Sequence, residues 1–358
     1  MNKIFIIAGE ASGDWLGAKL IRELKGKAEF FGVGGVKMQG EGLKSIFPMQ
    51  EISLMGFAEI LPHIANLKRR MRQTEDEIRR IKPDVVVTID SPGFNFRIAE
   101  RVQDLRSGVK FLHYVAPTVW AYKPKRALTV NRLFDKLLCI LPFEPPYFNN
   151  AEFIGHPSLE DGLDKGDAAA FKSRHGIENF ICMMPGSRRG ELKRNLPIFK
   201  KAAEMMKMPV VIIAADNAVI DVSDWKVKTI VVNNIEKADC FAACSAGVIK
   251  SGTSGLEFAF ANKPYIVAYK VSYPSYLIIK MLVKIKYANL LNILAGKELV
   301  KELLQGEVTP ENIEVELLET MEHADMSEYR ANLDKLRPIQ GSPSANAAAA
   351  VLKLCQSS

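Results

Sequence analysis

Short apolar runs rich in β-branched residues recur along the chain, and longer stretches with helical spacing of apolar residues separate them. The first group of runs covers 3–9, 84–90, 110–116 and 136–142, and the second covers 179–186, 209–215, 228–233, 246–252 and 264–269. Runs that are apolar throughout are typical of parallel strands that helices cover on both faces. The pattern therefore predicts an α/β fold with two Rossmann-like, doubly wound parallel-sheet domains that face a cleft.

The two groups of strands are separated by the segment 143–178, which is rich in proline, glycine and acidic residues. Such a composition is typical of an interdomain connection. At 358 residues the chain is long enough for two cores, because single cores seldom grow beyond about 250–300 residues. We expect a first domain over 1–170, a second over 171–340, and a C-terminal helix over 341–358 that packs back on the first domain.

The net charge of +7 favours an anionic partner such as a phosphorylated small molecule, an acidic lipid surface or nucleic acid. Nucleic acid is the least favoured of the three, because the loops lack interleaved aromatic and basic residues suited to stacking on bases. No apolar run reaches the roughly 20 residues of a membrane-spanning helix. The apolar stretch near the N-terminus, 4–8, is also too short for a signal peptide, so we expect a protein that is neither exported nor integral to a membrane.

The five cysteines form no CxxC pair and have no neighbouring histidines that would complete a zinc site. We therefore expect reduced, mostly buried thiols in a cytoplasmic protein, and no metal. Two histidines fall near candidate loops. His113 lies within a predicted strand and is expected to be a core residue, whereas His156 in the connection is as well explained by a structural role as by a catalytic one.

Ligands of doubly wound sheets bind beyond the carboxyl ends of the strands, and in the second half two such ends carry "PGSR" (185–188) and "SGTSGLE" (251–257). Two helix starts rich in glycine and hydroxyl groups suit a diphosphate. The candidate contacts are Gly186, Ser187, Arg188, Ser251, Gly252 and Thr253. Solvated arginines in an ordinary turn are the alternative. Glu257 either accepts a hydrogen bond from a ribose hydroxyl or serves only the helix dipole.

In the first half, Asp90 ends a predicted strand and precedes Pro92 by two positions. A carboxylate there can take a proton from an incoming hydroxyl, although an N-cap for the following helix explains the same residue. In "GEASGD" (9–14), Glu10 and Asp14 are weaker candidates for the same work. Together with Ser12, they are expected substrate contacts.

Two stretches, 54–72 and 274–286, combine an apolar stripe at helical spacing with clustered lysine or arginine residues. Basic amphipathic helices lie on anionic membrane surfaces or hold acyl chains, while packing on the protein's own core is the alternative. The expected membrane or acyl contacts in the first stretch are Met55, Phe57, Ile60, Leu61 and Ile64.

Taken in order, the sequence strings resemble the lipid-A-disaccharide synthase family, which are GT-B-type glycosyltransferases of Gram-negative bacteria. The strings are "AGEASGD", "GVGG", "LMGFAEIL", "IDSPGFN", "YVAPTVWAY", "LPFE", "GHP", "PGSR", "SGTSGLE", "VKIKY" and "NILAGKELVKELLQ". They run nearly from end to end of the chain. One departure is Leu291, where the family usually has proline.

The resemblance implies a hexosyltransferase of lipid A biosynthesis that needs no metal or cofactor. It would move 2,3-diacylglucosamine from UDP to the 6-hydroxyl of 2,3-diacylglucosamine 1-phosphate, with inversion. The first domain would bind the acceptor and the membrane, and the second the UDP-sugar. In that reaction Asp90 is the general base and Arg188 stabilises the leaving group. Asn292, carried over by its motif, belongs near the diphosphate or the reacting sugar.

The resemblance also implies peripheral association with the cytoplasmic face of the inner membrane, and a homo-oligomer is compatible with the sequence. One alternative is another enzyme of this architecture that uses UDP-N-acetylglucosamine, such as an epimerase. A nucleotide-sugar-binding membrane adaptor without catalysis is the rival from another class.

Overall fold

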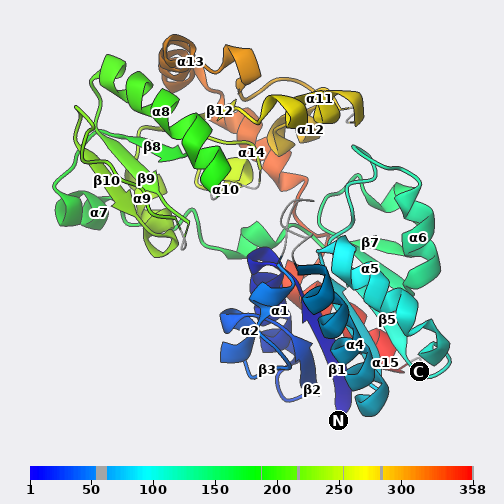
Figure 1. The fold of residues 1–358 in the computed structure, drawn as a ribbon. Coiled ribbons are helices and arrows are strands. Elements are labelled where there is room, and N and C mark those ends of the chain that lie inside the picture. The colour runs from blue at the N-terminus through cyan, green and yellow to red at the C-terminus, as the bar shows by residue number, and fades with distance from the viewer. Residues whose placement is uncertain (54–62, 187, 216–217, 253, 283–284, 357–358) are drawn as a thin grey trace. The chain divides into compact units, whose positions relative to one another are not determined.

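The computed structural model describes residues 1–53, 63–186, 188–215, 218–252, 254–282 and 285–356 (Figure 1). The chain divides into two compact units. Unit 1 comprises Met1–Pro157 with Pro338–Ser358, and unit 2 comprises Ser158–Arg337. The boundaries between the units therefore fall at 157/158 and 337/338, whereas the sequence predicts them at 170/171 and 340/341. The segment after Pro157 belongs to unit 2, where the backbone N–H of Asp167 donates to Asp239 Oδ1 at 2.8 Å.

Unit 1 is built on a sheet with the strand order β3-β2-β1-β4-β5-β6-β7, and every described pairing in it is parallel. The strands are β1 (Asn2–Ala8), β2 (Ala28–Val33), β3 (Lys44–Ser45), β4 (Val85–Ile89), β5 (Lys110–Tyr114), β6 (Lys136–Cys139) and β7 (Ala151–Phe153). The helices are α1 (Ala11–Leu24), α2 (Val36–Gly40), α4 (Ile64–Ile81), α5 (Pro92–Arg101), α6 (Arg126–Leu133) and α15 (Pro343–Gln356). Helix α15 returns from the C-terminal end to pack against α1 and β4.

Unit 2 repeats the plan with the strand order β10-β9-β8-β11-β12-β13, again with parallel pairings. The strands are β8 (Ile181–Met184), β9 (Val210–Ile213), β10 (Thr229–Val232), β11 (Ala246–Ile249), β12 (Tyr265–Tyr269) and β13 (Glu302–Leu304). The helices are α7 (Ala168–His175), α8 (Arg189–Met206), α9 (Lys237–Ala243), α10 (Ser254–Phe260), α11 (Tyr273–Leu282), α12 (Leu290–Ala295), α13 (Pro310–His323) and α14 (Met326–Asp334). The expected two-domain α/β architecture is confirmed.

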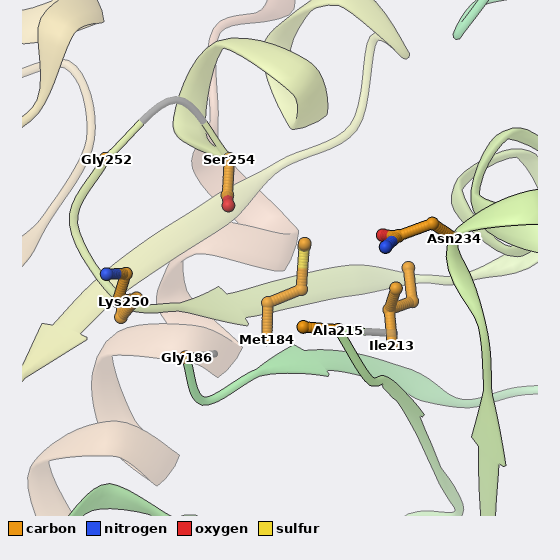
Figure 2. A pocket seen from close by; sticks show the side chains of 8 residues that line it. All are labelled: Met184, Gly186, Ile213, Ala215, Asn234, Lys250, Gly252 and Ser254. Atoms are coloured by element: carbon orange, nitrogen blue, oxygen red, sulfur yellow. The ribbon is translucent and has the colours of Figure 1, made fainter. Parts of the chain in front are cut away.

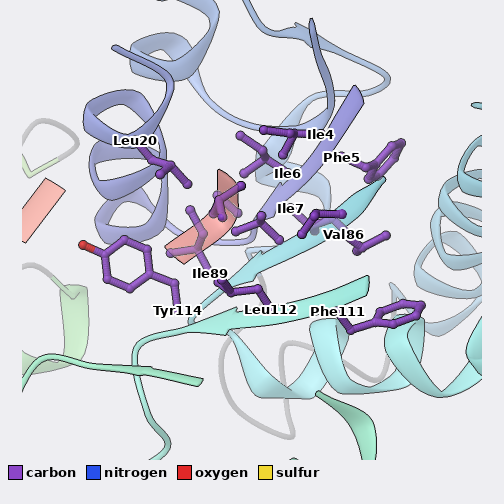
Figure 3. Close-up of a cluster of buried hydrophobic side chains, with 14 of the residues drawn as sticks. Ile4, Phe5, Ile6, Ile7, Leu20, Val86, Ile89, Phe111, Leu112 and Tyr114 are labelled. Atoms are coloured by element: carbon purple, nitrogen blue, oxygen red, sulfur yellow. The ribbon is translucent and has the colours of Figure 1, made fainter. Parts of the chain in front are cut away.

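The core of unit 1 forms around β1 and β4, in which every residue of 4–8 and 85–89 is buried and all but Thr88 are apolar (Figure 3). Ile4, Phe5, Ile6 and Ile7 are all 0% exposed. Full burial of one such side chain contributes about 1.5–3 kcal/mol. Leu20 of α1 packs in the same cluster. Burial on both faces fixes the sheet and therefore the positions at which its strands end.

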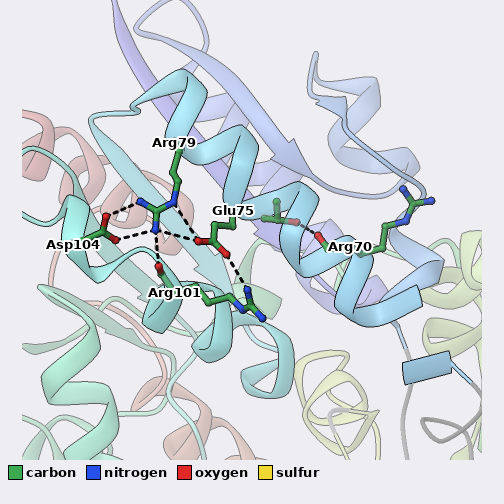
Figure 4. Close-up of polar contacts among 6 residues, drawn as sticks. Arg70, Glu75, Arg79, Arg101 and Asp104 are labelled. Atoms are coloured by element: carbon green, nitrogen blue, oxygen red, sulfur yellow. Dashed lines mark hydrogen bonds and ion pairs between the residues drawn. The ribbon is translucent and has the colours of Figure 1, made fainter. Parts of the chain in front are cut away.

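Ion pairs fasten α4 to the rest of unit 1 (Figure 4). Arg79 Nη2 lies 3.1 Å from Glu75 Oε1 within the helix. Both side chains also reach other segments: Arg101 Nη1 of α5 lies 2.9 Å from Glu75 Oε2, and Arg79 Nη1 lies 2.6 Å from Asp104 Oδ2. Burial raises the pKa of Glu75, but the hydrogen bonds from Arg101 and Arg79 outweigh it and the net shift is downward. In the first half of the helix, Arg70 Nε donates to Glu51 Oε2 at 2.7 Å. Arg70 is thus anchored within unit 1.

Candidate functional site

In each sheet there is one pair of neighbouring strands from which the chain continues toward opposite edges of the sheet. In unit 1 this pair is β1 and β4, and in unit 2 it is β8 and β11. A crevice opens at the carboxyl ends of such strand pairs, and ligands of this fold class bind there. The predicted residues follow these four strands: Glu10 after β1, Asp90 after β4, Gly186 after β8 and Ser251 after β11.

Asp90 occupies a strained turn directly after β4. Its φ is 49° and that of Ser91 is 43°, so two successive non-glycine residues adopt the left-handed conformation. Such backbone costs on the order of 1–3 kcal/mol per residue and collects at functional sites. The turn is held in place because the Asp90 N–H donates to Tyr114 O at 2.9 Å. Asn95 Nδ2 also donates to Asp90 O at 2.7 Å.

The environment of Asp90 strengthens its carboxylate as a base. Burial raises the pKa of the Asp90 carboxyl above its ordinary value, and a hydrogen bond from the Ser91 backbone offsets part of that rise. A base whose pKa is closer to the working pH takes a proton more effectively. The N-cap of α5 is Ser91, so the alternative in which Asp90 caps the helix is wrong.

The "GEASGD" loop packs against this turn. Ser91 Oγ donates to Glu10 Oε1 at 3.4 Å, and a Cβ added to Gly9 would lie 2.6 Å from Ser91 Oγ. Only glycine allows that approach. Glu10 is the N-cap of α1, and Ser12 is exposed in its first turn. Glu10 therefore borders the Asp90 turn, and substrate contact by Glu10 and Ser12 stays a prediction.

Asp14 has a structural task within unit 1. Its buried carboxylate accepts backbone N–H groups from Gly35 at 2.7 Å, Lys37 at 3.0 Å and Met38 at 3.0 Å. These N–H groups belong to the N-terminus of α2, where an anion stabilises the unpaired donors. Asp14 therefore joins α1 to α2, and its predicted contact with substrate stays a prediction.

In unit 2 a cavity of about 240 Å³ opens at the carboxyl ends of β8, β9 and β11 (Figure 2). Its lining is Met184, Gly186, Ile213, Ala215, Asn234, Lys250, Gly252 and Ser254. Gly186 and Gly252 have φ values of 121° and 137°, which side chains rarely adopt. A Cβ at Gly186 would also lie 2.6 Å from Glu191 Oε2. Two of the predicted diphosphate contacts thus border one cavity.

The other predicted contacts in unit 2 differ in their surroundings. Arg188 is the N-cap of α8, its side chain is 58% exposed, and its Nη1 lies 3.7 Å from Glu191 Oε1. The Ser251 hydroxyl donates to Ala288 O at 2.9 Å. The predictions for Ser187 and Thr253 lie outside the described residues.

Glu257 pairs with a cation of the neighbouring helix α9. Lys237 Nζ lies 3.1 Å from both carboxylate oxygens of Glu257. The carboxylate is thus engaged within unit 2, and its predicted contact with a ribose hydroxyl stays a prediction.

The family model described as lipid-A-disaccharide synthetase matches residues 4–352. A lipid-A-disaccharide synthase of Gluconobacter oxydans (strain 621H) is 39% identical, over 98% of this chain and 90% of the relative. One of Rickettsia felis (strain ATCC VR-1525 / URRWXCal2) is 41% identical, over 85% of this chain and 83% of the relative. The chain belongs to the lipid-A-disaccharide synthase family. It is therefore a glycosyltransferase of lipid A biosynthesis, as the sequence predicts.

Solved structures at lower identity share the fold. The kitacinnamycin glycotransferase superposes with a TM-score of 0.68 at 15% identity, over 99% of both chains. The UDP-GlcNAc 2-epimerase of Neisseria meningitidis bound to UDP-GlcNAc gives 0.59 at 14% identity, over 99% of this chain and 100% of that one. These likenesses confirm the GT-B type of architecture for this member of the lipid-A-disaccharide synthase family.

Asn292, which the family motif singles out, is 0% exposed. Its Oδ1 accepts the N–H groups of Leu299 and Val300, each at 2.8 Å. Its Nδ2 donates to Val300 O at 2.7 Å and to Glu302 Oε1 at 2.8 Å. These bonds hold the loop after α12, so the structure gives Asn292 a positioning task. Contact with the diphosphate or sugar stays a prediction for this family member.

Four polar residues at or next to the unit 2 cavity were not named as candidates in the sequence analysis. Lys250, Asn234 and Ser254 line the cavity, and Glu191 contacts Lys250. Lys250 directly follows β11, and Asn234 follows β10 within two residues. Their places at strand ends were a usable signal. No signal in the sequence pointed to Glu191, because its contact with Lys250 forms only in the folded chain.

The cysteines and His113 behave as expected. Cys139, Cys182, Cys240 and Cys244 are buried free thiols, and Cys355 is a half-buried one. Burial lowers the pKa of His113 to about 3, and the ring stacks on Phe134 in the core. Among the described residues, no three histidine, cysteine, aspartate or glutamate side chains gather as they do around a metal ion.

His156 is 4% exposed, and burial lowers its pKa to about 4. A neutral, enclosed imidazole favours the structural alternative.

Of the two amphipathic stretches, the first lies partly outside the described residues, which include none of Met55, Phe57, Ile60 and Leu61. Within α4, Ile64 is 39% exposed whereas Met71 is buried in the core. In the second stretch, α11 exposes Tyr273, Leu277 and Met281 beside Lys280. In the described parts of the chain, no helix is long and apolar enough to cross a bilayer.

Proposed function

We propose that this chain moves 2,3-diacylglucosamine from UDP to the 6-hydroxyl of 2,3-diacylglucosamine 1-phosphate, with inversion at the anomeric carbon. The observation that carries the proposal is the half-buried Asp90 carboxylate, presented by a strained turn at the switch point of unit 1 with a raised pKa. Family membership supplies the class of substrates. Unit 1 then binds the acceptor, and unit 2 binds the UDP-sugar.

The cavity of unit 2 supports the second half of this assignment. Ile213, Ala215 and Asn234 lie toward one end, and Lys250 and Gly252 lie toward the other (Figure 2). An apolar end with one amide suits a flat base, and a cationic end between two glycine-rich loops suits a diphosphate. The lining therefore fits a nucleoside diphosphate such as UDP.

In the proposed step, the acceptor 6-hydroxyl oxygen attacks the anomeric carbon while its proton passes to the Asp90 carboxylate. The bond from the anomeric carbon to the β-phosphate oxygen breaks, and its electron pair leaves with UDP. General-base assistance of this kind contributes about 10²–10⁴-fold. The charge that develops on the phosphate is stabilised by Arg188 and by N–H groups at the glycine-rich helix starts.

We further propose that the chain works while bound peripherally to the cytoplasmic face of the inner membrane. Both substrates of the proposed reaction carry acyl chains. The exposed Met281 and Leu277 beside Lys280 offer an apolar and cationic surface for anionic lipid.

The test is an assay with both diacylated substrates in detergent and EDTA, read by mass spectrometry. We expect a tetra-acylated disaccharide monophosphate together with stoichiometric UDP. Release of UDP without the disaccharide would indicate hydrolysis or another acceptor. Conversion of UDP-N-acetylglucosamine alone would instead favour an epimerase.

A further inference from the structure

The carboxylate of Glu191 pairs with Lys250, which lines the unit 2 cavity, and the Glu191 side chain is only 4% exposed. Lys250 Nζ donates to its Oε1 at 2.9 Å, and Tyr269 OH donates to the same oxygen at 3.2 Å. The backbone N–H of Arg188 donates to Oε2 at 3.3 Å. A buried carboxylate is costly unless cations and donors surround it, and here they come from three separate segments. Glu191 is therefore bound firmly enough to fix its partners.

Lys250 is the partner that reaches the cavity. Among the described residues of the lining, it is the one side chain with a formal charge. Its ammonium also lies 5.5 Å from the centroid of the Tyr269 ring. The ammonium has three donors, and one of them is directed to Glu191. Arg188, by contrast, extends a side chain that is 58% exposed.

The charge balance of this group favours an anion. Lys250 and Arg188 together carry two positive charges, and Glu191 carries one negative charge, so the group has a net charge of +1. Gly186 and Gly252 flank it with backbone that a side chain would obstruct or strain. A phosphate that enters between these loops meets a cation that is already ordered, which lowers the entropic cost of binding.

We infer that Lys250, positioned by Glu191, makes a charged contact with the diphosphate of the nucleotide sugar, in addition to the Arg188 contact. The inference rests on the proposed function, because it assumes that a UDP-sugar occupies this cavity. As the bond to the anomeric carbon breaks, the same ammonium stabilises the charge on the departing phosphate. Lys250 thus acts in both binding and turnover.

The test compares Lys250→Met and Lys250→Arg by calorimetric titration with UDP, and by ligand-observed NMR with uridine, which lacks phosphates. We expect Lys250→Met to weaken UDP about 10- to 100-fold, the usual range for one charge-assisted hydrogen bond. Uridine affinity should stay within about twofold, and Lys250→Arg should keep most of the UDP affinity. Lys250→Gln serves as a second neutral variant if Lys250→Met does not fold.

Lys200→Met is the matched control, because Lys200 is likewise paired with a carboxylate, Asp224, on the surface of unit 2. Lys200→Met should bind UDP with the affinity of the wild-type protein. Equal UDP affinity in the unchanged chain and in Lys250→Met would overturn the assignment of Lys250 and leave the proposed function standing. An unchanged chain that binds no UDP would overturn the proposed function, and the role of Lys250 with it.

Discussion

Asn292 Nδ2 donates to Glu302 Oε1 across 2.8 Å in the interior of unit 2. Glu302 also accepts the backbone N–H groups of Ala288 at 2.7 Å and Asn289 at 2.9 Å. Ala288 O in turn accepts the Ser251 hydroxyl beside the cavity. A continuous set of hydrogen bonds therefore connects the loop after α12 to the loop that borders the candidate diphosphate site.

Asn292→Ala should lower the free energy of unfolding of unit 2 by about 3–5 kcal/mol. The substitution leaves the N–H groups of Leu299 and Val300 without their acceptor, and each buried orphan costs about 1–3 kcal/mol. Chemical denaturation measures the effect. Asn312→Ala, which removes one exposed hydrogen bond to Glu307 O, is the control and should cost under about 1 kcal/mol. Equal losses in the two variants would refute the buried network.

The central strands of the sheets could be predicted, because strands buried on both faces appear in the sequence as runs of apolar residues. β1 and β4 are apolar at nearly every position, and both correspond to predicted runs. β2 escaped prediction because Glu29 is exposed and Phe30 is only half-buried. β13 escaped because Glu302, which is turned into the hydrogen-bond network, reads as a polar position.

Among the residues of the candidate site, too, some could be predicted from the sequence and others could not. Asp90 could be named from sequence because its place at the end of an apolar run is local information. The contact of Lys250 with Glu191 could not, since it joins residues 59 positions apart and exists only once β8 and β11 lie side by side. Asp14 shows what sequence could not give: its carboxylate accepts the N–H groups at the start of α2, whereas its contact with substrate stays a prediction.

Gly186→Ala should weaken UDP binding by about tenfold or more and destabilise unit 2. The new Cβ would lie 2.6 Å from Glu191 Oε2, so the carboxylate that positions Lys250 must move. Gly252→Ala is a matched comparison, because Gly252 also has a positive φ but a Cβ there meets nothing within 4 Å. Calorimetric titration of both variants separates the clash from the backbone strain. A larger loss of affinity in Gly252→Ala would contradict the role given to Glu191.

Asp90→Ala should reduce turnover by at least about 100-fold while UDP binding persists. Asp90→Asn should do the same and also raise the thermal stability at pH 8. The folded-state pKa of Asp90 is raised, so the stability it contributes is present at low pH and is lost as the pH rises through that value. The gain in melting temperature should therefore vanish at low pH. Asp76→Asn on the exposed face of α4 is the control and should change neither property.

Glu144 should give unit 1 a titration near neutral pH. Burial raises the pKa of this carboxyl to about 7, and Trp120 Nε1 donates to its Oε1 at 3.4 Å. Stability from Glu144 is full below the unfolded pKa and falls as the pH rises through about 7. Tryptophan fluorescence should follow with a midpoint near that value. Glu144→Gln should abolish the transition and raise stability at pH 8; a transition that survives in Glu144→Gln would assign it to another group.

Replacing Leu277 and Met281 together with serine should weaken binding to vesicles that contain anionic lipid. These side chains are 44% and 74% exposed on α11, and burying such apolar area at a lipid surface contributes about 25 cal/mol per Å². The matched control replaces Val315 and Leu318 of α13, which are 60% and 43% exposed. Sedimentation with vesicles should show a loss in the α11 variant alone. Equal sedimentation of both variants would leave 54–72 as the surface to test, by serine substitution of Phe57, Leu61 and Ile64.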